Sequence, residues 1–272
     1  MPAYHQMGHD SENLLLESGL EAFRGMIASP VNYSESDINL QLAGLRAADG
    51  RNDFDVVFDP QLYFPRTERG CLRDWRYFPT DVDTGDRDSD EWWEPLVTSL
   101  ASTIGSMSVN AICSPAEVPR AFPDAYFEQA IRVGNMLAAA LRGSAVRPLQ
   151  TVIVGLAELS TPRRALEVAS TVSATKCSGV YLVFVGSTEP RRELAHVEEL
   201  KGAMRLIHAL AREAKLPVLV GYCSTDLVLW KAAGATSVAT GKFFNLRRFT
   251  LSRFEEPGGG GETPSFFLVR EV

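Results

Sequence analysis

The chain has 272 residues, 45% hydrophobic and 22% charged, which is enough to bury a large core within one domain. Its formal net charge of −7 argues against a broad nucleic-acid-binding surface, because neutralising phosphates needs a basic face. The 4 cysteines form no C-x-x-C pair, which argues against a zinc site and favours a reducing, cytoplasmic location. No apolar run approaches the length of a membrane span, and the polar N-terminus is not typical of a signal peptide.

Strand and helix patterns alternate strictly from residue 25 onwards. Each strand is a short, apolar run rich in β-branched residues, as in strands buried on both faces. Helical patterns follow, such as the apolar positions Leu200, Met204, Ile207 and Leu210 at helical spacing. The seven predicted strands are 25–29, 54–58, 109–113, 149–155, 179–186, 216–222 and 236–239.

This alternation predicts an α/β fold with a parallel sheet. Seven or eight units close most readily into a TIM-type (β/α) barrel with no helix after the last strand, and an open doubly wound parallel sheet is the alternative. The chain resembles TIM-barrel enzymes in this alternation and in its glycine-bracketed late strands. We expect an N-terminal helical segment at 1–24, with a short helix near 13–23, a single barrel domain at 25–257, and a Gly-rich linker with a terminal strand at 258–272.

The first three predicted strands end in the same way, each with a polar residue followed by proline. Proline cannot continue a parallel ladder, so the three strands should stop on one face of the barrel. Catalytic groups of TIM barrels lie at the carboxyl ends of the strands, which makes this face the expected site. The three strand ends are Ser29-Pro30, Asp59-Pro60 and Ser114-Pro115.

Asp59 is the first catalytic candidate. It follows an apolar strand, where desolvation should raise its pKa and suit it to acid–base or nucleophilic chemistry at a cavity. The competing interpretation is a carboxylate that caps its own Asp-Pro turn. Glu158, shortly after the fourth predicted strand, is the candidate for a second carboxylate, or else a glutamate in solvent.

Basic residues after Gly241 are candidates for binding an anion, as in the late loops of many barrels. We expect Arg247 to point inward at the rim and Arg248 outward. Alternatively, one of these arginines pairs with Asp59 or with the acidic loop and ties the barrel shut. The substrate-binding candidates on this rim are Asn32, Gln61, Tyr63, Tyr222, Lys242, Asn245 and Arg247.

The long loop 61–91 joins an aromatic and arginine-rich half to an acidic half. The aromatic half should pack down on the barrel and the acidic run 81–91 should stay solvated. An EF-hand needs glycine at its sixth and glutamate at its twelfth position, but these are Asp86 and Trp92. No metal or other cofactor is predicted.

A fainter resemblance is to the barrel of tRNA-guanine transglycosylases, which use aspartates at strand ends to exchange a base. The resemblance implies such a role for Asp59 alone. That family's zinc-binding cysteine cluster and its glycine-rich base-recognition signature are absent from this sequence. The tRNA-binding role of the family is therefore not carried over.

Two functions remain open. The first is a barrel enzyme, with transglycosylase- or hydrolase-like carboxylate chemistry on a small anionic or nucleotide- or sugar-like substrate. The second is a catalytically silent barrel within a larger or oligomeric assembly, with segments 63–78 and 262–272 as protein contacts. Rim carboxylates around an open pocket would favour the enzyme, whereas a rim filled by its own side chains would favour the subunit.

Overall fold

Eight parallel strands close into a barrel in the computed structural model, which describes residues 1–9, 11, 23–47, 53–64, 70–80, 86–188 and 192–254. Each strand pairs with the next along the chain, and the last pairs with the first. This closure confirms the TIM-type barrel and excludes the open sheet. The strands are β1 (Ala3–Gln6), β2 (Phe23–Ala28), β3 (Asp55–Phe58), β4 (Ala111–Cys113), β5 (Arg147–Gly155), β6 (Gly179–Val185), β7 (Val218–Val220) and β8 (Ser237–Thr240).

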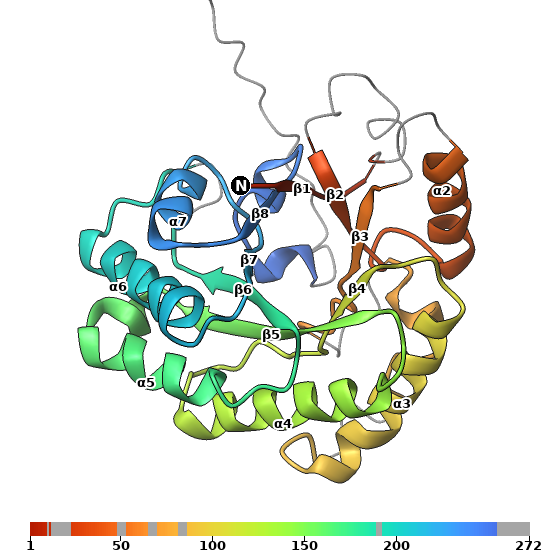
Figure 1. Ribbon diagram of the computed structural model, residues 1–272, viewed down its shortest axis with the longest axis horizontal. Coiled ribbons are helices and arrows are strands. Elements are labelled where there is room, and N and C mark those ends of the chain that lie inside the picture. The colour runs from red at the N-terminus through yellow and green to blue at the C-terminus, as the bar shows by residue number, and fades with distance from the viewer. Residues whose placement is uncertain are drawn as a thin grey trace, which may run out of the picture.

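The α-helices lie in chain order around the outside of the strands (Figure 1). Within the described ranges, β8 is followed by two short 3-10 helices, η5 (Phe244–Leu246) and η6 (Leu251–Arg253), instead of an α-helix. Two other 3-10 helices, η2 (Leu72–Asp74) and η3 (Ala157–Ser160), and a π-helical turn, η4 (Ala209–Glu213), lie in connections. The α-helices are α2 (Glu35–Ala47), α3 (Asp90–Gly105), α4 (Asp124–Ala140), α5 (Pro162–Val172), α6 (Val197–His208) and α7 (Leu227–Ala233).

The strand that closes the barrel comes from the N-terminal segment. β1 pairs with β2 on one side and with β8 on the other. The expectation of a helical segment at 1–24 is wrong for Ala3–Gln6, because four residues that include a polar pair carry no recognisable strand pattern. The helix expected near 13–23, the linker and the terminal strand near 265–269 lie outside the described residues.

The barrel has an inner and an outer core because strand side chains alternate between two faces. In β3, Val57 packs in the inner core, while Val56 and Phe58 face the helices. The same alternation continues past the strand end and turns Asp59 inward. The inner core includes Ile27, Val57, Ala111, Cys113, Leu149, Ile153, Tyr181, Val183, Leu219 and Ala239.

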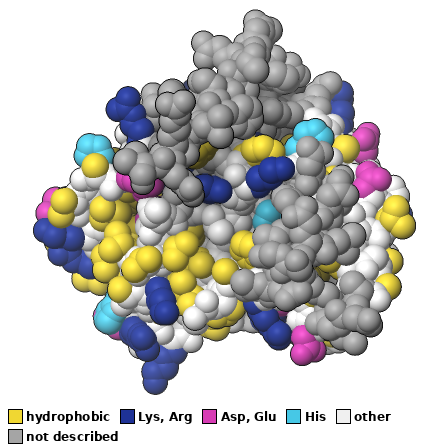
Figure 2. Space-filling view, turned by 90° about the horizontal axis from the view of Figure 1, so that it is seen from above, with side chains coloured by type: hydrophobic (Ala, Val, Ile, Leu, Met, Phe, Trp, Pro, Cys, Tyr) yellow, Lys and Arg dark blue, Asp and Glu magenta, His cyan; other side chains and the backbone are white. Residues whose placement is uncertain are grey.

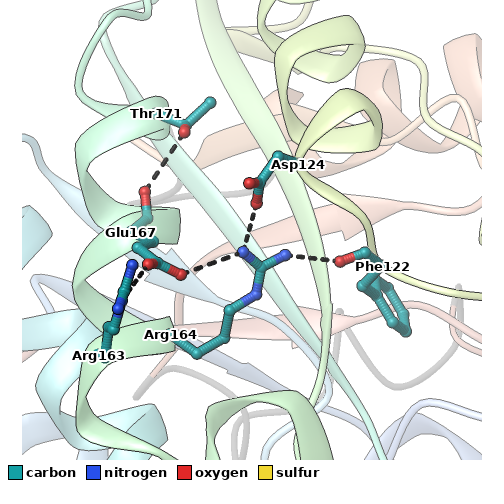
Figure 3. A network of polar contacts seen from close by, with 6 residues as sticks. All are labelled: Phe122, Asp124, Arg163, Arg164, Glu167 and Thr171. Atoms are coloured by element: carbon teal, nitrogen blue, oxygen red, sulfur yellow. Dashed lines mark hydrogen bonds and ion pairs between the residues drawn. The ribbon is translucent and has the colours of Figure 1, made fainter.

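A half-buried arginine, Arg164, connects α5 to the start of α4 (Figure 3). The guanidinium of Arg164 donates to the Asp124 carboxylate and, over 2.7 Å, to the carbonyl oxygen of Phe122. It also lies 5.5 Å from the ring centroid of Phe127. Glu167 accepts from the neighbouring Arg163 over 2.7 Å. One side chain thus links two helices at the end of the barrel where α4 and α5 begin.

The described parts of the long loop divide as expected. Trp75 and Tyr77 are buried, and the indole N–H of Trp75 donates to the Pro30 carbonyl oxygen over 3.2 Å. The end of the acidic run forms the start of α3. Ser89 caps this helix by accepting a hydrogen bond from the Trp92 N–H, and Asp90 and Glu91 lie in its first turn. Acidic residues in a first turn are favoured by the helix dipole. Residues 81–85 lie outside the described part.

In the view from above, the lysines and arginines of the described surface are scattered in small groups among hydrophobic and other side chains (Figure 2). None of the helices in the described ranges combines the length and apolarity needed to cross a bilayer. Among the same residues, potential metal-ligating side chains do not come together in groups of three or more.

Close packing of β2 against β3 gives a first prediction. A Cβ on Gly25 would lie 2.0 Å from the carbonyl oxygen of Asp55, so Gly25→Ala should destabilise the fold by about 2–4 kcal/mol. The matched control is Gly44→Ala in α2, where a Cβ meets nothing within 4 Å. The control should stabilise the helix by about 0.5–1 kcal/mol. Urea unfolding of both variants measures the difference, and equal effects would contradict the close contact between these strands.

Candidate active site

The three proline-terminated strand ends lie at the same end of the barrel. Pro30, Pro60 and Pro115 follow β2, β3 and β4, which run parallel and in adjacent positions. The three prolines therefore lie on one face of the barrel, as the sequence predicted. This face is the carboxyl end of the barrel, where TIM-barrel enzymes carry their active sites.

Asp59 lies at this end, buried to 1% exposure. The hydroxyl of Tyr63 donates to its Oδ2 over 2.7 Å, and the N–H of Gln61 donates to its Oδ1 over 3.0 Å. Burial raises the pKa of Asp59 to about 6, against the opposing effects of Tyr63, Gln61 and the charge of Arg253. The predicted rise is confirmed. Asp59 also caps its own turn by accepting the N–H of Gln61, as the competing interpretation predicted.

Three buried tyrosines surround the carboxylate. Tyr63 follows β3, Tyr181 lies in β6, and Tyr222 follows β7. Burial, with the charge of Asp59 as a further cause, raises the pKa of all three phenols. At neutral pH these side chains are therefore uncharged and can donate hydrogen bonds to an oxygen atom.

Two residues of this cluster have a backbone conformation that non-glycine residues rarely adopt. Gln61 has φ of 54° and Tyr222 has φ of 55°; Lys215 is the third such residue in the described ranges. Each costs about 1–3 kcal/mol, and such residues cluster at functional sites. Adjacent to Tyr222, a Cβ on Gly221 would lie 2.6 Å from the Tyr181 hydroxyl, so glycine is required for this close approach.

The hydroxyl of Ser29 joins side chains from three loops. It donates to Gln61 Oε1 over 3.0 Å and accepts from Asn32 Nδ2 over 2.8 Å. It also accepts from Nη2 of Arg253 over 3.0 Å, and the same Nη2 donates to the Met7 carbonyl oxygen over 3.1 Å. Arg253 is 6% exposed, so a buried cation lies in the network next to Asp59.

The mouth of the barrel is covered by residues 242–254, here called the closing segment. Its rings of Phe249 and Phe254 pack 5.1 and 5.0 Å from the ring of Tyr63, and Phe249 packs 5.2 Å from Tyr222. In Figure 1 this segment, in blue, lies inside the ring of helices. Asp59 was expected to face a cavity, but this aromatic cover separates it from solvent. The sequence could not show which residues fill the mouth.

The two consecutive arginines of the closing segment point opposite to the prediction. Arg247 is exposed and donates to the Gly241 carbonyl oxygen over 2.9 Å, whereas Arg248 is 5% exposed. The reason is the tight η5 turn, which reverses the side-chain directions expected for an extended chain. Arg248 donates to the Arg192 carbonyl oxygen over 3.0 Å and lies 3.7 Å from Asp226. An arginine therefore ties this segment down, but through Asp226 and not through Asp59.

The structure brings together five of the nine candidate residues and leaves four apart. Glu158 is exposed on η3, Lys242 and Arg247 are exposed, and Asn245 is half-buried. Hydrogen bonds within the described residues do not connect Glu158 with Asp59. The five that cluster are Asn32, Asp59, Gln61, Tyr63 and Tyr222.

Four members of the cluster were not among the candidates from the sequence. Arg253 and Ser29 belong to the network above, and the Tyr181 hydroxyl lies 3.4 Å from Gln6 Oε1. Tyr181 could have been found, because it is the polar residue at an inward position of an apolar strand. Ser29 carried the same strand-end signal as Asp59. Gln6 had no local signal. Arg253 is one of the basic residues after Gly241, but its position beside Asp59 depends on barrel closure.

An open pocket of about 620 Å³ lies beside the cluster, between the loop after β4 and α4. Phe64 and Ala116 line it and also pack against the inner core. Glu117, another carboxylate of this rim, pairs there with Arg87. Its volume is within the range of small-molecule sites. Phe64 follows Tyr63, the residue that binds Asp59, directly in the chain.

No protein-family model matches the chain, and no curated protein matches it in sequence. Among solved structures, it is similar to a putative fructose-1,6-biphosphate aldolase from Coccidioides immitis, with 10% identity, 88% of this chain and 73% of that chain covered, and a TM-score of 0.47. It is also similar to the tryptophan synthase alpha subunit from Campylobacter jejuni, with 14% identity, 88% of this chain and 85% of that chain covered, and a TM-score of 0.43. A third similar structure is an enolase from Bradyrhizobium, with 13% identity, 90% of this chain covered and a TM-score of 0.44. The match covers 53% of that chain, so this chain spans about half of that protein.

The raised pKa of Asp59 predicts a particular dependence of stability on pH. An unfolded aspartate loses its proton near pH 4, whereas folded Asp59 keeps it to about pH 6. The folded state binds more protons in this window, so stability is lost as the pH rises from about 4 to 6. Asp59→Asn removes this loss. Its stability relative to the wild type should rise by roughly 3 kcal/mol between pH 4 and pH 7.

Urea unfolding of both proteins across this pH range makes the measurement, and a carbon-13 titration of the Asp59 carboxyl gives its pKa directly. A stability difference that does not change with pH would show that Asp59 has an ordinary pKa.

Proposed function

We propose that this barrel is an enzyme in which Asp59 carries out acid–base or nucleophilic chemistry on a small anionic substrate. One observation carries the proposal: a fully buried carboxylate with a raised pKa lies among three neutral tyrosines at the carboxyl end of the barrel. A residue that only capped a turn would not need this environment. Perturbed carboxylates in such surroundings are typical of catalytic sites.

The environment of Asp59 suits proton transfer. With a pKa of about 6, both protonation states are accessible near neutral pH, which is the condition for efficient general acid–base catalysis. Tyr63 holds one carboxylate oxygen and the N–H of Gln61 holds the other. The same fixed orientation would serve a nucleophilic carboxylate in glycosyl transfer or hydrolysis.

The substrate would enter by displacement of the closing segment. The adjoining pocket of about 620 Å³ offers room for its body beside Phe64. Lys242 and Arg247, which are exposed at the start and middle of the closing segment, would attract its anionic group. Glu158 would need a rearrangement to act with Asp59, because it is exposed on η3.

A silent structural barrel is the second candidate, and one observation favours it: the mouth is filled by Phe249, Phe254 and Tyr63. Another observation speaks against its proposed contact surface. Trp75 and Tyr77, the aromatic anchors expected there, are buried in this chain's own core. Segment 262–272 lies outside the described residues.

Turnover of an identified ligand tests the catalytic role. A stability-shift screen with nucleotides, sugar phosphates and small organic acids would find the ligand. Asp59→Asn should then keep ligand-induced stabilisation while lowering turnover by about 10²–10⁴-fold. Glu158→Gln decides whether the second carboxylate takes part. Unchanged turnover in Asp59→Asn would exclude Asp59 from the chemistry.

Hydrogen exchange tests whether the closing segment opens. We expect the amides of Leu246 and Phe254 to exchange through a local opening that requires far less free energy than global unfolding. The reference is the paired core of β5 and β6, at Val152 and Leu182, which should exchange only on global unfolding. If the closing segment exchanges as slowly as this core, the mouth stays shut and the silent barrel is favoured.

A further inference from the structure

We infer that the buried cluster beside Asp59 contains a binding site for the carboxylate group of a small monoanionic organic acid, formed by Gln61, Tyr222 and Arg253. This inference deepens the proposed function by naming the substrate class, and it rests on that function only for the chemistry at Asp59. The site differs from the exposed residues Lys242 and Arg247, because it is buried between the barrel and Arg253 of the closing segment.

Each of the three side chains has a polar atom without a hydrogen-bond partner among the described residues. These atoms are Nε2 of Gln61, the hydroxyl of Tyr222 and Nη1 of Arg253, and all are fully enclosed. The three residues are 1%, 5% and 6% exposed. An unpaired buried polar group costs about 1–3 kcal/mol, so three in one cluster indicate a missing partner.

The orientation of the Gln61 amide is fixed by its neighbours. Its Oε1 accepts from the backbone N–H of Val31 over 3.1 Å and from Ser29 Oγ over 3.0 Å. A backbone N–H can only donate, so the oxygen must face Val31 and the NH₂ group must face away. Gln61 therefore presents two donor hydrogens to the cluster. Its left-handed backbone holds the side chain in this place.

The unpaired atoms belong to side chains in mutual contact. Gln61 and Arg253 both bond to the hydroxyl of Ser29, which places them within one side chain of each other. The guanidinium of Arg253 lies 6.0 Å from the ring centroid of Tyr222. Burial raises the pKa of Tyr222, and weak polar contacts of its hydroxyl with Gln61 and Tyr63 lower it, although neither contact has the geometry of a hydrogen bond. A single small group could therefore contact all three.

The chemistry of these atoms defines the ligand. The amide and guanidinium nitrogens can only donate and the phenol can donate, so the missing partner is an acceptor. One arginine supplies one positive charge, and the Asp59 carboxylate is close enough to interact with it. A dianion such as phosphate would place excess negative charge in a buried site, which is strongly unfavourable. A planar carboxylate, which matches the guanidinium fork, fits this charge balance.

Binding of a carboxylate should be linked to protonation of Asp59. The titratable groups facing Asp59 are Tyr63 and Tyr77 from the loop after β3, Cys113 of β4, Tyr181 of β6, Tyr222 after β7 and Arg253 of η6. Burial raises the pKa of each of these phenols and of the thiol, and arginine stays charged, so only Asp59 titrates between pH 5 and 8. Below pH 6 its negative charge disappears, and an anion should bind more tightly.

Tyr222→Phe is the sharpest test, because it removes a hydroxyl that has no well-formed hydrogen bond to any of the described residues. The fold should be as stable as the wild type or more so, while affinity for the carboxylate falls about tenfold. Tyr4→Phe is the matched control: its hydroxyl donates to Asp55 over 2.6 Å at the opposite end of the barrel. The control should lose some stability and keep its affinity.

The probes are acetate, glycolate, lactate, pyruvate and benzoate, with inorganic phosphate as the comparison, measured by calorimetry at pH 5.5 and 7.5. We expect one or more of the monocarboxylates to bind, more tightly at pH 5.5. Asp59→Asn should bind at least as tightly as the wild type at pH 7.5 and show no pH dependence. This variant separates the two proposals. If Asp59 has no catalytic role, the protein should still bind monocarboxylates through Gln61, Tyr222 and Arg253.

Three results would overturn the inference. They are no binding of any monocarboxylate by the wild type, binding that Tyr222→Phe leaves unchanged, and tighter binding of phosphate that depends on Tyr222.

Discussion

The pairing of β1 with β8 is the constraint on which the rest of the structure depends. Parallel strands left at open edges would expose unpaired backbone groups, and closure of the barrel removes both edges. The same pairing sets the site. It places Gln6 beside Tyr181 and brings the Met7 carbonyl oxygen to Arg253. The polar cluster around Asp59 therefore exists only in the closed barrel, since its members come from strands and loops along the whole chain.

Buried charged residues at the mouth of the barrel both hold the closing segment in place and border the cluster around Asp59. Arg248 holds the closing segment to Asp226 and to the carbonyl of Arg192, and Arg253 holds it to the loops after β1 and β2. Removing a partner from a buried charge is strongly destabilising. A ligand with acceptor atoms could replace the contacts of Arg253 with these loops, so that the guanidinium would not be left unpaired. Binding and movement of the segment would then be parts of one equilibrium.

The fold was largely predictable from the sequence, whereas the site was predictable only in part. Seven strands were recognisable because apolar β-branched runs report burial directly, and Asp59 was recognisable because it ended one of them. β1 was missed, since a short strand with polar residues has no such pattern. Arg247 was placed inward and Arg248 outward, and the η5 turn reverses both. Contacts such as Arg253 with Ser29 depend on tertiary structure, so no local pattern encodes them.

The hydrogen bond between Arg253 and Met7 joins residues 246 positions apart. During synthesis, β1 must therefore wait for nearly all of the described chain before its second neighbour, β8, is available. Contacts of such long range form late and slow the folding of a chain. Until then, an incomplete sheet with an open edge persists, and such edges are prone to pair with other chains. The arrangement that encloses the site thus leaves the nascent chain with an exposed sheet edge until its final strand emerges.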